Sequence, residues 1–242
     1  MFWPDVIELK SFYASTEGHI ACAQIRRRLH ELWPEATNET MLGIGYATPY
    51  LLPYLDKTDL VAACMPAPQG VIHWPQTRAN LSVLVDEGEL PFATGTINRL
   101  LLVHSLENSE QVRRMLEEAR RVLTPSGRMI VVAPNRASGW SRASHSPFAN
   151  GQPYSYWQLR KLLQECKFSH VQTRSALYFP PKSGRVFLRA AKVIDYIGAK
   201  LFPGLCGVLL MEVEKQVYAQ SGGKLVPAPA RRYAPAAVPA GQ

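Results

Sequence analysis

Short runs of apolar residues alternate along this chain with segments in which apolar residues recur every three or four positions. The runs lie at 40–44, 59–64, 81–85, 97–104, 128–133, 170–179 and 207–213. Continuous apolar runs of this length are typical of strands buried on both faces of a parallel sheet. With helices between them, they predict an α/β fold, a three-layer sandwich around a mainly parallel, seven-stranded sheet.

Helices are predicted where the apolar spacing follows one helical face, at 15–32, 109–123, 155–166 and 186–201, with a short helix at 48–54. Thr48 and Ser109 are the expected N-caps of the short helix and of the helix at 109–123. Residues 5–12 are expected to form a short lead-in. Residues 65–75 contain three prolines and a glycine. A loop is therefore expected where a crossover helix would usually lie.

This pattern divides the chain into three regions. Residues 1–39 are an N-terminal helical lead-in, residues 40–220 form the α/β domain, and residues 221–242 form a tail. The tail is rich in proline and alanine and is expected to be disordered.

The net charge of +8 results from 27 basic and 19 acidic residues. Such an excess favours contact with nucleic acid or an anionic membrane surface. The basic residues are scattered and are not interleaved with aromatic residues, so a nucleic-acid partner is not expected. The four cysteines have no CxxC or zinc-site spacing, so no metal site is predicted and a cytoplasmic, reducing location is expected. Neither a signal peptide nor a transmembrane segment is predicted.

The carboxyl ends of the predicted parallel strands are the expected ligand site, because α/β sheets bind ligands at this edge. The first strand leads into Gly43-Ile44-Gly45-Tyr46-Ala47. Gly45 permits a tight turn and lets backbone N–H groups approach a ligand. The later strand ends add Met65, Asp86, Glu87, His104 and Asn135.

Four blocks of sequence resemble the class I S-adenosylmethionine (SAM)-dependent methyltransferases of the type 11 group. They are the glycine turn at 41–47, DEGELPF at 86–92, the strand at 98–104 and EARRVLTPSGR at 118–128. The resemblance covers about residues 40–215 and implies a Rossmann-like fold, SAM as cofactor and methylation as the activity. It places a set of residues around the cofactor: Gly43, Gly45, Tyr46, Ala47, Met65, Asp86, Glu87 and His104. Asp86 matches the family acid that accepts a hydrogen bond from the adenine amino group.

The chain departs from the family pattern at two polar anchors. Gly43 replaces the acid of the first turn, and Met65 stands where an acid usually binds the ribose hydroxyls. Ala47 and Pro49 replace the later glycines of the turn. Two hypotheses therefore stay open: a methyltransferase acting on a small-molecule acceptor, or a binding or regulatory protein that keeps the fold and has lost SAM. A nicotinamide-dependent oxidoreductase is disfavoured, because the GxGxxG turn is missing.

The long loop after the fifth strand, residues 134–153, is the expected acceptor side of the site. Its basic and aromatic side chains suit an anionic acceptor, and the candidate substrate residues are Asn135, Arg136, Trp140 and Tyr154. Catalytic candidates, which would orient the acceptor or take a proton, are His104, Asn135 and His145. Tyr154 equally suits a packing role beside the N-terminus of the next helix.

The segment 185–205 combines an apolar stripe with a basic face that includes Arg185, Arg189 and Lys192. It is interpreted as a lid, a surface for a protein partner, a membrane-surface contact or a helix packed into the core.

Overall fold

The computed structural model describes residues 3–181 and 185–216, apart from the side chains of residues 185–189, 192 and 203. The predicted tail at 221–242 and the proposed basic side chains Arg185, Arg189 and Lys192 lie outside this description. None of the described helices is long and apolar enough to cross a membrane.

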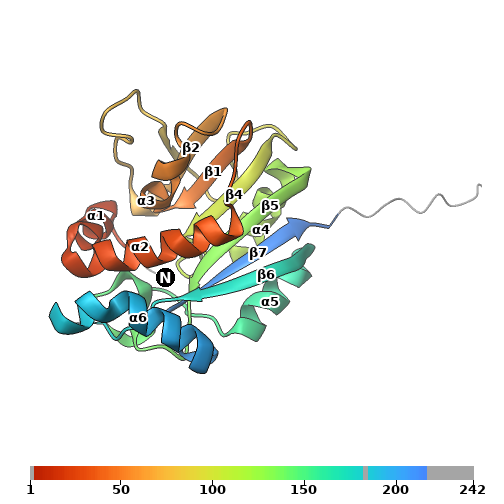
Figure 1. The fold of residues 1–242 in the computed structure, drawn as a ribbon. Helices are drawn as coiled ribbons and strands as arrows, with labels where there is room; N and C mark the ends of the chain where they lie inside the picture. The colour runs from red at the N-terminus through yellow and green to blue at the C-terminus, as the bar shows by residue number, and fades with distance from the viewer. Residues whose placement is uncertain (1–2, 182–184, 217–242) are drawn as a thin grey trace, which may run out of the picture.

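A twisted seven-stranded sheet forms the centre of the molecule, with helices on both faces (Figure 1). The strand order is β3-β2-β1-β4-β5-β7-β6. The strands are β1 (Thr40–Gly45), β2 (Leu60–Pro66), β3 (Ser82–Val85), β4 (Ile97–Val103), β5 (Leu123–Pro134), β6 (Phe168–Ala176) and β7 (Val208–Lys215). The helices are α1 (Val6–Ala14), α2 (Thr16–Leu32), α3 (Thr48–Leu51), α4 (Val112–Val122), α5 (Tyr156–Glu165) and α6 (Arg185–Leu201).

The sheet is mixed, which corrects part of the sequence prediction. The five neighbouring strands β3, β2, β1, β4 and β5 are parallel to one another, as predicted. Strand β7 runs antiparallel to both β5 and β6. The apolar run of β7 gave no sign of its direction, because a strand covered on both faces reads alike whichever way it runs.

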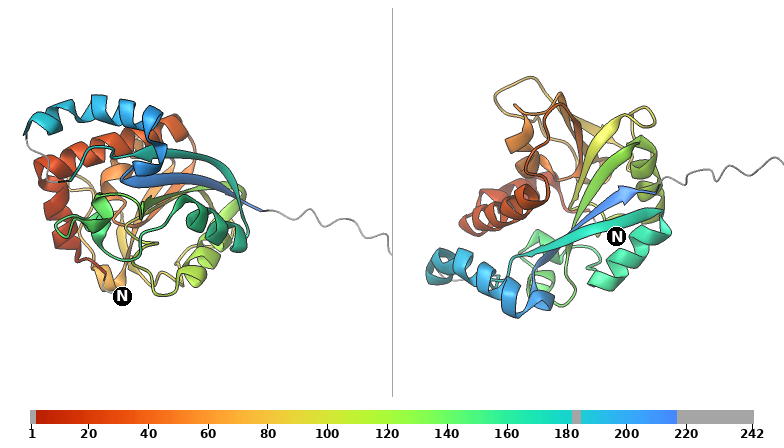
Figure 2. Two further views of the ribbon diagram at one scale, coloured as in Figure 1. Left: turned by 90° about the horizontal axis from the view of Figure 1, so that it is seen from below. Right: turned by 45° about the vertical axis from the view of Figure 1, so that its right-hand side comes forward.

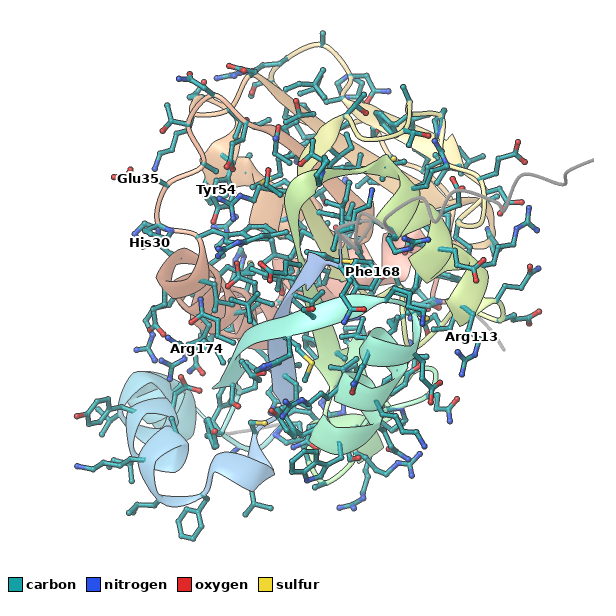
Figure 3. All side chains as sticks on the ribbon, turned by 90° about the vertical axis from the view of Figure 1, so that its right-hand side faces the viewer. His30, Glu35, Tyr54, Arg113, Phe168 and Arg174 are labelled. Atoms are coloured by element: carbon teal, nitrogen blue, oxygen red, sulfur yellow. The ribbon has the colours of Figure 1, made fainter. Side chains whose placement is uncertain are left out.

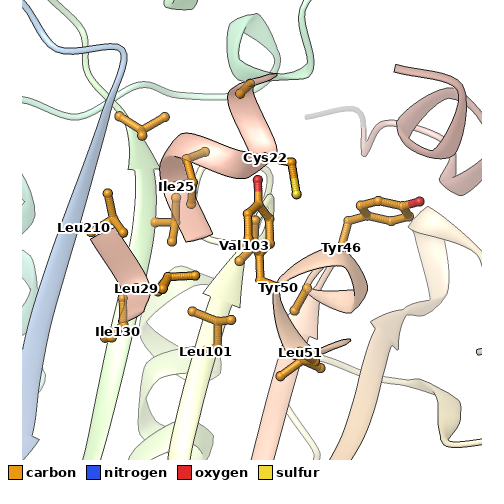
Figure 4. Close-up of a cluster of buried hydrophobic side chains, with 14 of the residues drawn as sticks. Cys22, Ile25, Leu29, Tyr46, Tyr50, Leu51, Leu101, Val103, Ile130 and Leu210 are labelled. Atoms are coloured by element: carbon orange, nitrogen blue, oxygen red, sulfur yellow. The ribbon is translucent and has the colours of Figure 1, made fainter. Parts of the chain in front are cut away.

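Alternate residues of each central strand contribute to two separate cores. Met41, Leu101 and Ile130 pack beneath α1, α2 and α3, whereas Leu42, Leu100 and Met129 pack against α4 and α5. Figure 2 shows these two helical layers on opposite sides of the sheet. In Figure 4, the ring of Tyr50 stands between Cys22 of α2 and Val103 of β4.

Local details at the helix N-termini differ from the sequence predictions. The lead-in at residues 5–12 is helical and belongs largely to α1, which Asp5 caps by accepting a hydrogen bond from the Ile7 backbone at 2.7 Å. The short helix α3 has Ala47 at its N-cap position, without a side-chain cap, so Thr48 is not the cap. Helix α4 begins three residues later than predicted, because the Ser109 hydroxyl donates to Glu87 instead of capping a helix.

Candidate functional site

The glycine turn after β1 is tightly packed against the neighbouring strand. Gly45 has a φ of +84°, and the next backbone N–H, that of Tyr46, donates to the Val103 carbonyl at 2.9 Å. A Cβ at Gly45 would lie 2.2 Å from that carbonyl oxygen, and one at Gly43 would lie 2.5 Å from the Ala47 Cβ. Close packing of β4 and α3 is therefore sufficient to explain both glycines.

Aromatic side chains from α1 cover this turn. The ring of Tyr13 stacks on Tyr46 at a centroid distance of 5.4 Å and an interplanar angle of 20°. Tyr46 is 4% exposed and Ala47 is completely buried. Burial raises the pKa of Tyr46 to about 12. The N-terminal helix thus shields the segment that the resemblance assigns to the cofactor.

His104 lies at the centre of a buried polar network beneath α1. Its Nε2 atom is 2.8 Å from the Tyr13 hydroxyl, which is also 2.8 Å from the hydroxyl of Tyr50. On the other side of the ring, Nδ1 lies 3.3 Å from Oε1 of Glu107, and both side chains are 1% exposed. The ring of Phe148 covers His104 at 4.8 Å. The Nδ1–Oε1 contact is within ion-pair distance but is not a hydrogen bond, so Nδ1 and both Glu107 oxygens are buried without a hydrogen-bond partner.

Two further properties make this network distinctive. His104 has a φ of +51°, an uncommon backbone conformation for a residue other than glycine. Burial raises the pKa values of Tyr13 and Tyr50 well above that of a free phenol. Both hydroxyls therefore stay protonated at neutral pH, and the imidazole tautomer sets the direction of the hydrogen bond between Tyr13 and His104.

A cavity of about 430 Å³ opens at the ends of β2 and β3. Ala67, Pro68 and Trp3 supply apolar wall, and Asp86 and Glu87 supply carboxylates. Its volume lies within the range of roughly 300–1,000 Å³ that is usual for ligand pockets. The cavity lies at the carboxyl edge of the sheet, where the sequence placed a ligand.

Glu87 has one satisfied and one unsatisfied carboxylate oxygen. Oε1 accepts a hydrogen bond from the Ser109 hydroxyl at 2.7 Å, whereas Oε2 is buried without a partner. Burial raises the pKa of Glu87, and the neighbouring Asp86 adds to the rise while the Ser109 hydrogen bond opposes it. Asp86 itself is turned to the backbone, since its Oδ1 accepts from Gly88 N–H at 2.8 Å. Both carboxylates line the cavity; Asp86 is exposed and only its Oδ1 is engaged in this bond, whereas Oε2 of Glu87 is buried from solvent.

An open cleft of about 690 Å³ adjoins the cavity, and both are lined by Glu110 and Gln111. Arg136 and Tyr154, two of the predicted substrate residues, line this cleft together with Arg114 and Lys161. The Tyr154 hydroxyl donates to the Leu106 carbonyl at 3.4 Å, which connects the cleft to the loop that carries His104 and Glu107. Figure 3 shows Arg113, which pairs with Glu165 at 2.5 Å, at the outer end of this region.

The structure places the other predicted site residues away from both openings. Asn135 is 5% exposed, and its amide nitrogen donates to the carbonyls of Gly204 and Cys206. Trp140 is 1% exposed, and its indole N–H donates to Phe179 at 2.7 Å. His145 lies 3.6 Å from Glu17 of α2. Met65 is completely buried in the core between the sheet and helices α1, α2 and α3.

Three residues of the site were not among the sequence candidates. Tyr13 and Trp3 lie in the segment that was interpreted as a lead-in, where no motif marked them. Glu107 follows His104 by three residues, and a histidine–carboxylate pair at that spacing was the available signal. Among the described residues, no group of three or more His, Cys, Asp and Glu side chains is arranged to hold a metal ion.

The fit of SAM to these residues differs between its two ends. At the adenosine end, the cavity offers apolar walls and the exposed carboxylate of Asp86. At the methionine end, the glycine turn is buried under Tyr13 and Tyr46, with Gly43 in place of the usual acid. The cavity therefore fits adenosine as the structure stands, and access to the turn requires α1 to move.

The comparisons with known proteins agree with the fold. Residues 42–131 match the model of the methyltransferase domain family. A SAM-dependent methyltransferase from Thermotoga maritima has 17% identity and a TM-score of 0.65, with 87% of this chain and 96% of that chain covered. A SAM-dependent methyltransferase from Archaeoglobus fulgidus has 17% identity and a TM-score of 0.60, with 85% of this chain and 97% of that chain covered.

A third structure contains a ligand related to SAM. Geranyl diphosphate C-methyltransferase from Streptomyces coelicolor A3(2), solved with Mg²⁺, geranyl-S-thiolodiphosphate and S-adenosylhomocysteine, has 12% identity and a TM-score of 0.54. The alignment covers 79% of this chain and 75% of that one. At these identities the structures establish the fold alone. A search of curated protein sequences gives no match.

Proposed function

We propose that this chain, which has the fold of the class I SAM-dependent methyltransferases and matches their domain model at residues 42–131, is a SAM-dependent methyltransferase for a small, anionic acceptor. The observation that carries the proposal is the cavity at the ends of β2 and β3, which is lined by the exposed carboxylate of Asp86, by Glu87 and by apolar residues. Asp86, which the resemblance assigns to the adenine amino group, would accept its hydrogen bond, and Trp3 and Pro68 would supply apolar contact with the base.

When it is bound, SAM supplies a methyl group on a positively charged sulfur, so the leaving group needs no acid from the protein. The chain has to align the acceptor and exclude water. His104 takes the acceptor proton at Nε2, and Glu107 stabilises the positive charge that the imidazole then carries. In the closed structure the Tyr13 hydroxyl occupies the position of that proton donor, 2.8 Å from Nε2. Tyr13 must leave before an acceptor reaches His104.

The cleft beside the cavity is the proposed acceptor site. Arg114, Arg136 and Lys161 supply positive charge there, and guanidinium groups bind carboxylates and phosphates well. Asn135 and Trp140 as substrate residues and His145 as a catalytic residue stay predictions from the sequence, and none of them lines this cleft.

Isothermal titration with SAM and with S-adenosylhomocysteine tests the proposal. We expect both to bind, and Asp86→Ala to weaken them about 10–100-fold, the equivalent of a charged hydrogen bond of about 1.5–3 kcal/mol. Glu89→Ala is the matched control, because that carboxylate is exposed and does not line the cavity. Absence of heat and of thermal stabilisation at millimolar ligand would refute the proposal.

The buried glycine turn favours a second candidate, a binding or regulatory protein that keeps the fold without SAM. Gly43 and Gly45 are explained by internal packing alone. This candidate predicts that neither SAM nor S-adenosylhomocysteine binds, even after the Tyr13 contacts are removed, and that a stoichiometric protein partner is recovered with the chain. SAM binding by the full-length monomer would exclude it.

A further inference from the structure

The outer face of α6 exposes a continuous apolar stripe. Val193, Tyr196, Ile197 and Leu201 are 60%, 67%, 46% and 62% exposed, and Phe202 and Leu205 extend the stripe beyond the helix at 57% and 59%. The helical members are spaced three, four and eight residues apart from Val193, so they share one side of the helix. Exposed apolar patches of this extent mark interaction surfaces in proteins.

The opposite face of α6 fixes the helix against the body of the protein. Asp195 is fully buried and lies 2.9 Å from Arg27 and 3.3 Å from Arg28 of α2. Gly198 packs directly on Tyr178, because a Cβ there would lie 2.5 Å from that ring. Since these contacts set the rotation of the helix, the apolar stripe cannot turn inward.

Positive charge accompanies the stripe. Lys200 is exposed between Ile197 and Leu201 in the sequence, and Arg174 of β6, which is 40% exposed and pairs with Glu31 of α2 at 3.7 Å, lies beside α6 in Figure 3. Between residues 185 and 205 the sequence holds four basic residues and one acid, and that acid is the buried Asp195. Any partner that covers this face must therefore match an apolar centre with a positive margin.

Charge also distinguishes between the possible binding partners of this face of α6. Two copies of this face would bring positive groups together, which disfavours a dimer formed through it. The tail at 217–242 contains Lys224, Arg231 and Arg232 and no acidic residue, so it repeats the charge of α6 rather than complementing it. An anionic lipid surface supplies both the apolar layer and the negative charge that the face requires.

We propose that the exposed face of α6, defined by Val193, Tyr196, Ile197, Lys200, Leu201, Phe202 and Leu205, docks onto an anionic membrane surface. The helix lies in the plane of the interface, with its apolar side chains among the lipid headgroups and its basic side chains against their phosphates. Figures 1 and 2 show α6 projecting from the body on the same side as α1. Docking therefore holds the end of the protein that carries α1 near the membrane, independently of whether SAM binds.

Sedimentation of the full-length protein with phosphatidylcholine vesicles, with and without phosphatidylserine, tests this proposal. We expect binding to the anionic vesicles that falls as salt is added, because screening weakens the charge contribution. The triple variant Tyr196→Ser, Ile197→Ser, Leu201→Ser should bind at least about tenfold more weakly, since three apolar anchors are lost. Lys200→Glu should also weaken binding.

Matched variants keep the result specific to α6. Leu52, Leu60 and Leu84 are exposed at 48%, 47% and 50% on other elements, so their triple change to serine controls for the loss of surface apolarity. Lys57→Glu controls for charge, because Lys57 is exposed in the turn after α3. Both controls should bind vesicles like the wild type.

Three results would overturn the proposal: no vesicle binding by the wild type, equal binding to neutral vesicles, or equal losses in the control variants. Light scattering provides an independent arm. A concentration-dependent dimer that the α6 triple variant abolishes would assign the face to a second copy of the chain instead.

Discussion

The hydroxyl of Tyr13 on α1 lies 2.8 Å from Nε2 of His104 at the end of β4, across 91 positions of the sequence. This hydrogen bond ties the N-terminal helix to the histidine that the proposed mechanism requires. Since the same hydroxyl contacts Tyr50, one phenol closes the space above the glycine turn. Binding of a ligand at the glycine turn would therefore require this hydrogen bond to break.

Tyr13→Phe removes the closing hydrogen bonds and keeps the ring that stacks on Tyr46. We expect a loss of stability of about 1–3 kcal/mol, because buried polar atoms of His104 and Tyr50 lose a partner. SAM should bind more tightly, because a ligand that needs the open form gains when the closed form is weakened. Urea unfolding and isothermal titration measure the two effects.

Tyr54→Phe is the control for this prediction. Its buried hydroxyl donates to the Trp33 carbonyl at 3.2 Å, away from the turn. It should lower stability by a comparable amount and leave SAM affinity unchanged. Equal changes in affinity for the two variants would contradict the coupling between Tyr13 and the site.

Gly45→Ala and Gly95→Ala separate packing from backbone conformation. Both glycines have positive φ values, +84° and +72°, but a Cβ at Gly45 meets the Val103 carbonyl at 2.2 Å, whereas one at Gly95 meets nothing within 4 Å. We expect Gly95→Ala to lower the free energy of unfolding by about 1 kcal/mol and Gly45→Ala to lower it by about 3 kcal/mol or more. Equal losses in chemical unfolding would show that the contact with β4 is unimportant.

Glu87→Gln tests the raised pKa of the cavity carboxylate. Because burial raises its folded-state pKa, the folded protein holds the proton more tightly than the unfolded chain. Glu87 therefore lowers stability as pH rises from the ordinary glutamate pKa through the raised one. The variant should be the more stable protein at pH 7, and the difference should vanish below about pH 4. A pH-independent difference in urea midpoints would contradict this cause.

Glu212→Gln tests a buried carboxylate that joins α2 to the sheet. Glu212 is fully buried on β7 and accepts hydrogen bonds from Trp33 at 2.9 Å and Gln172 at 2.7 Å. The amide nitrogen of glutamine would face one of these two N–H donors, so we expect the free energy of unfolding to fall by about 3 kcal/mol. Glu214→Gln, two residues along the same strand and exposed, should change unfolding by less than about 0.5 kcal/mol.

The sheet and most of its helices could be predicted because their apolar spacing depends on burial, which the sequence records directly. The motif at 118–128 shows this well, since Ala119, Val122 and Leu123 are fully buried where the pattern placed them. The direction of β7 could not be predicted, because a doubly covered strand has the same pattern either way. Ser109 was misread as a helix cap, because its partner Glu87 is distant in sequence.

The site was predictable in position but not in detail. Strand ends located Asp86, Glu87 and His104, since parallel strands bring their carboxyl ends to one edge. The sequence did not reveal that Tyr13 covers the turn, because that contact depends on how α1 packs rather than on any local motif. It also predicted an apolar stripe on α6 without indicating that Val193, Ile197 and Leu201 face outward.

Hydrogen–deuterium exchange of the full chain with and without saturating S-adenosylhomocysteine tests the central claim most directly, because it reports where the ligand binds. The account predicts slower exchange at residues 85–88 beside the cavity and at 45–48 in the turn, with altered exchange across α1 as Tyr13 gives up its contact with His104. Unchanged exchange in all three segments at millimolar ligand would contradict it.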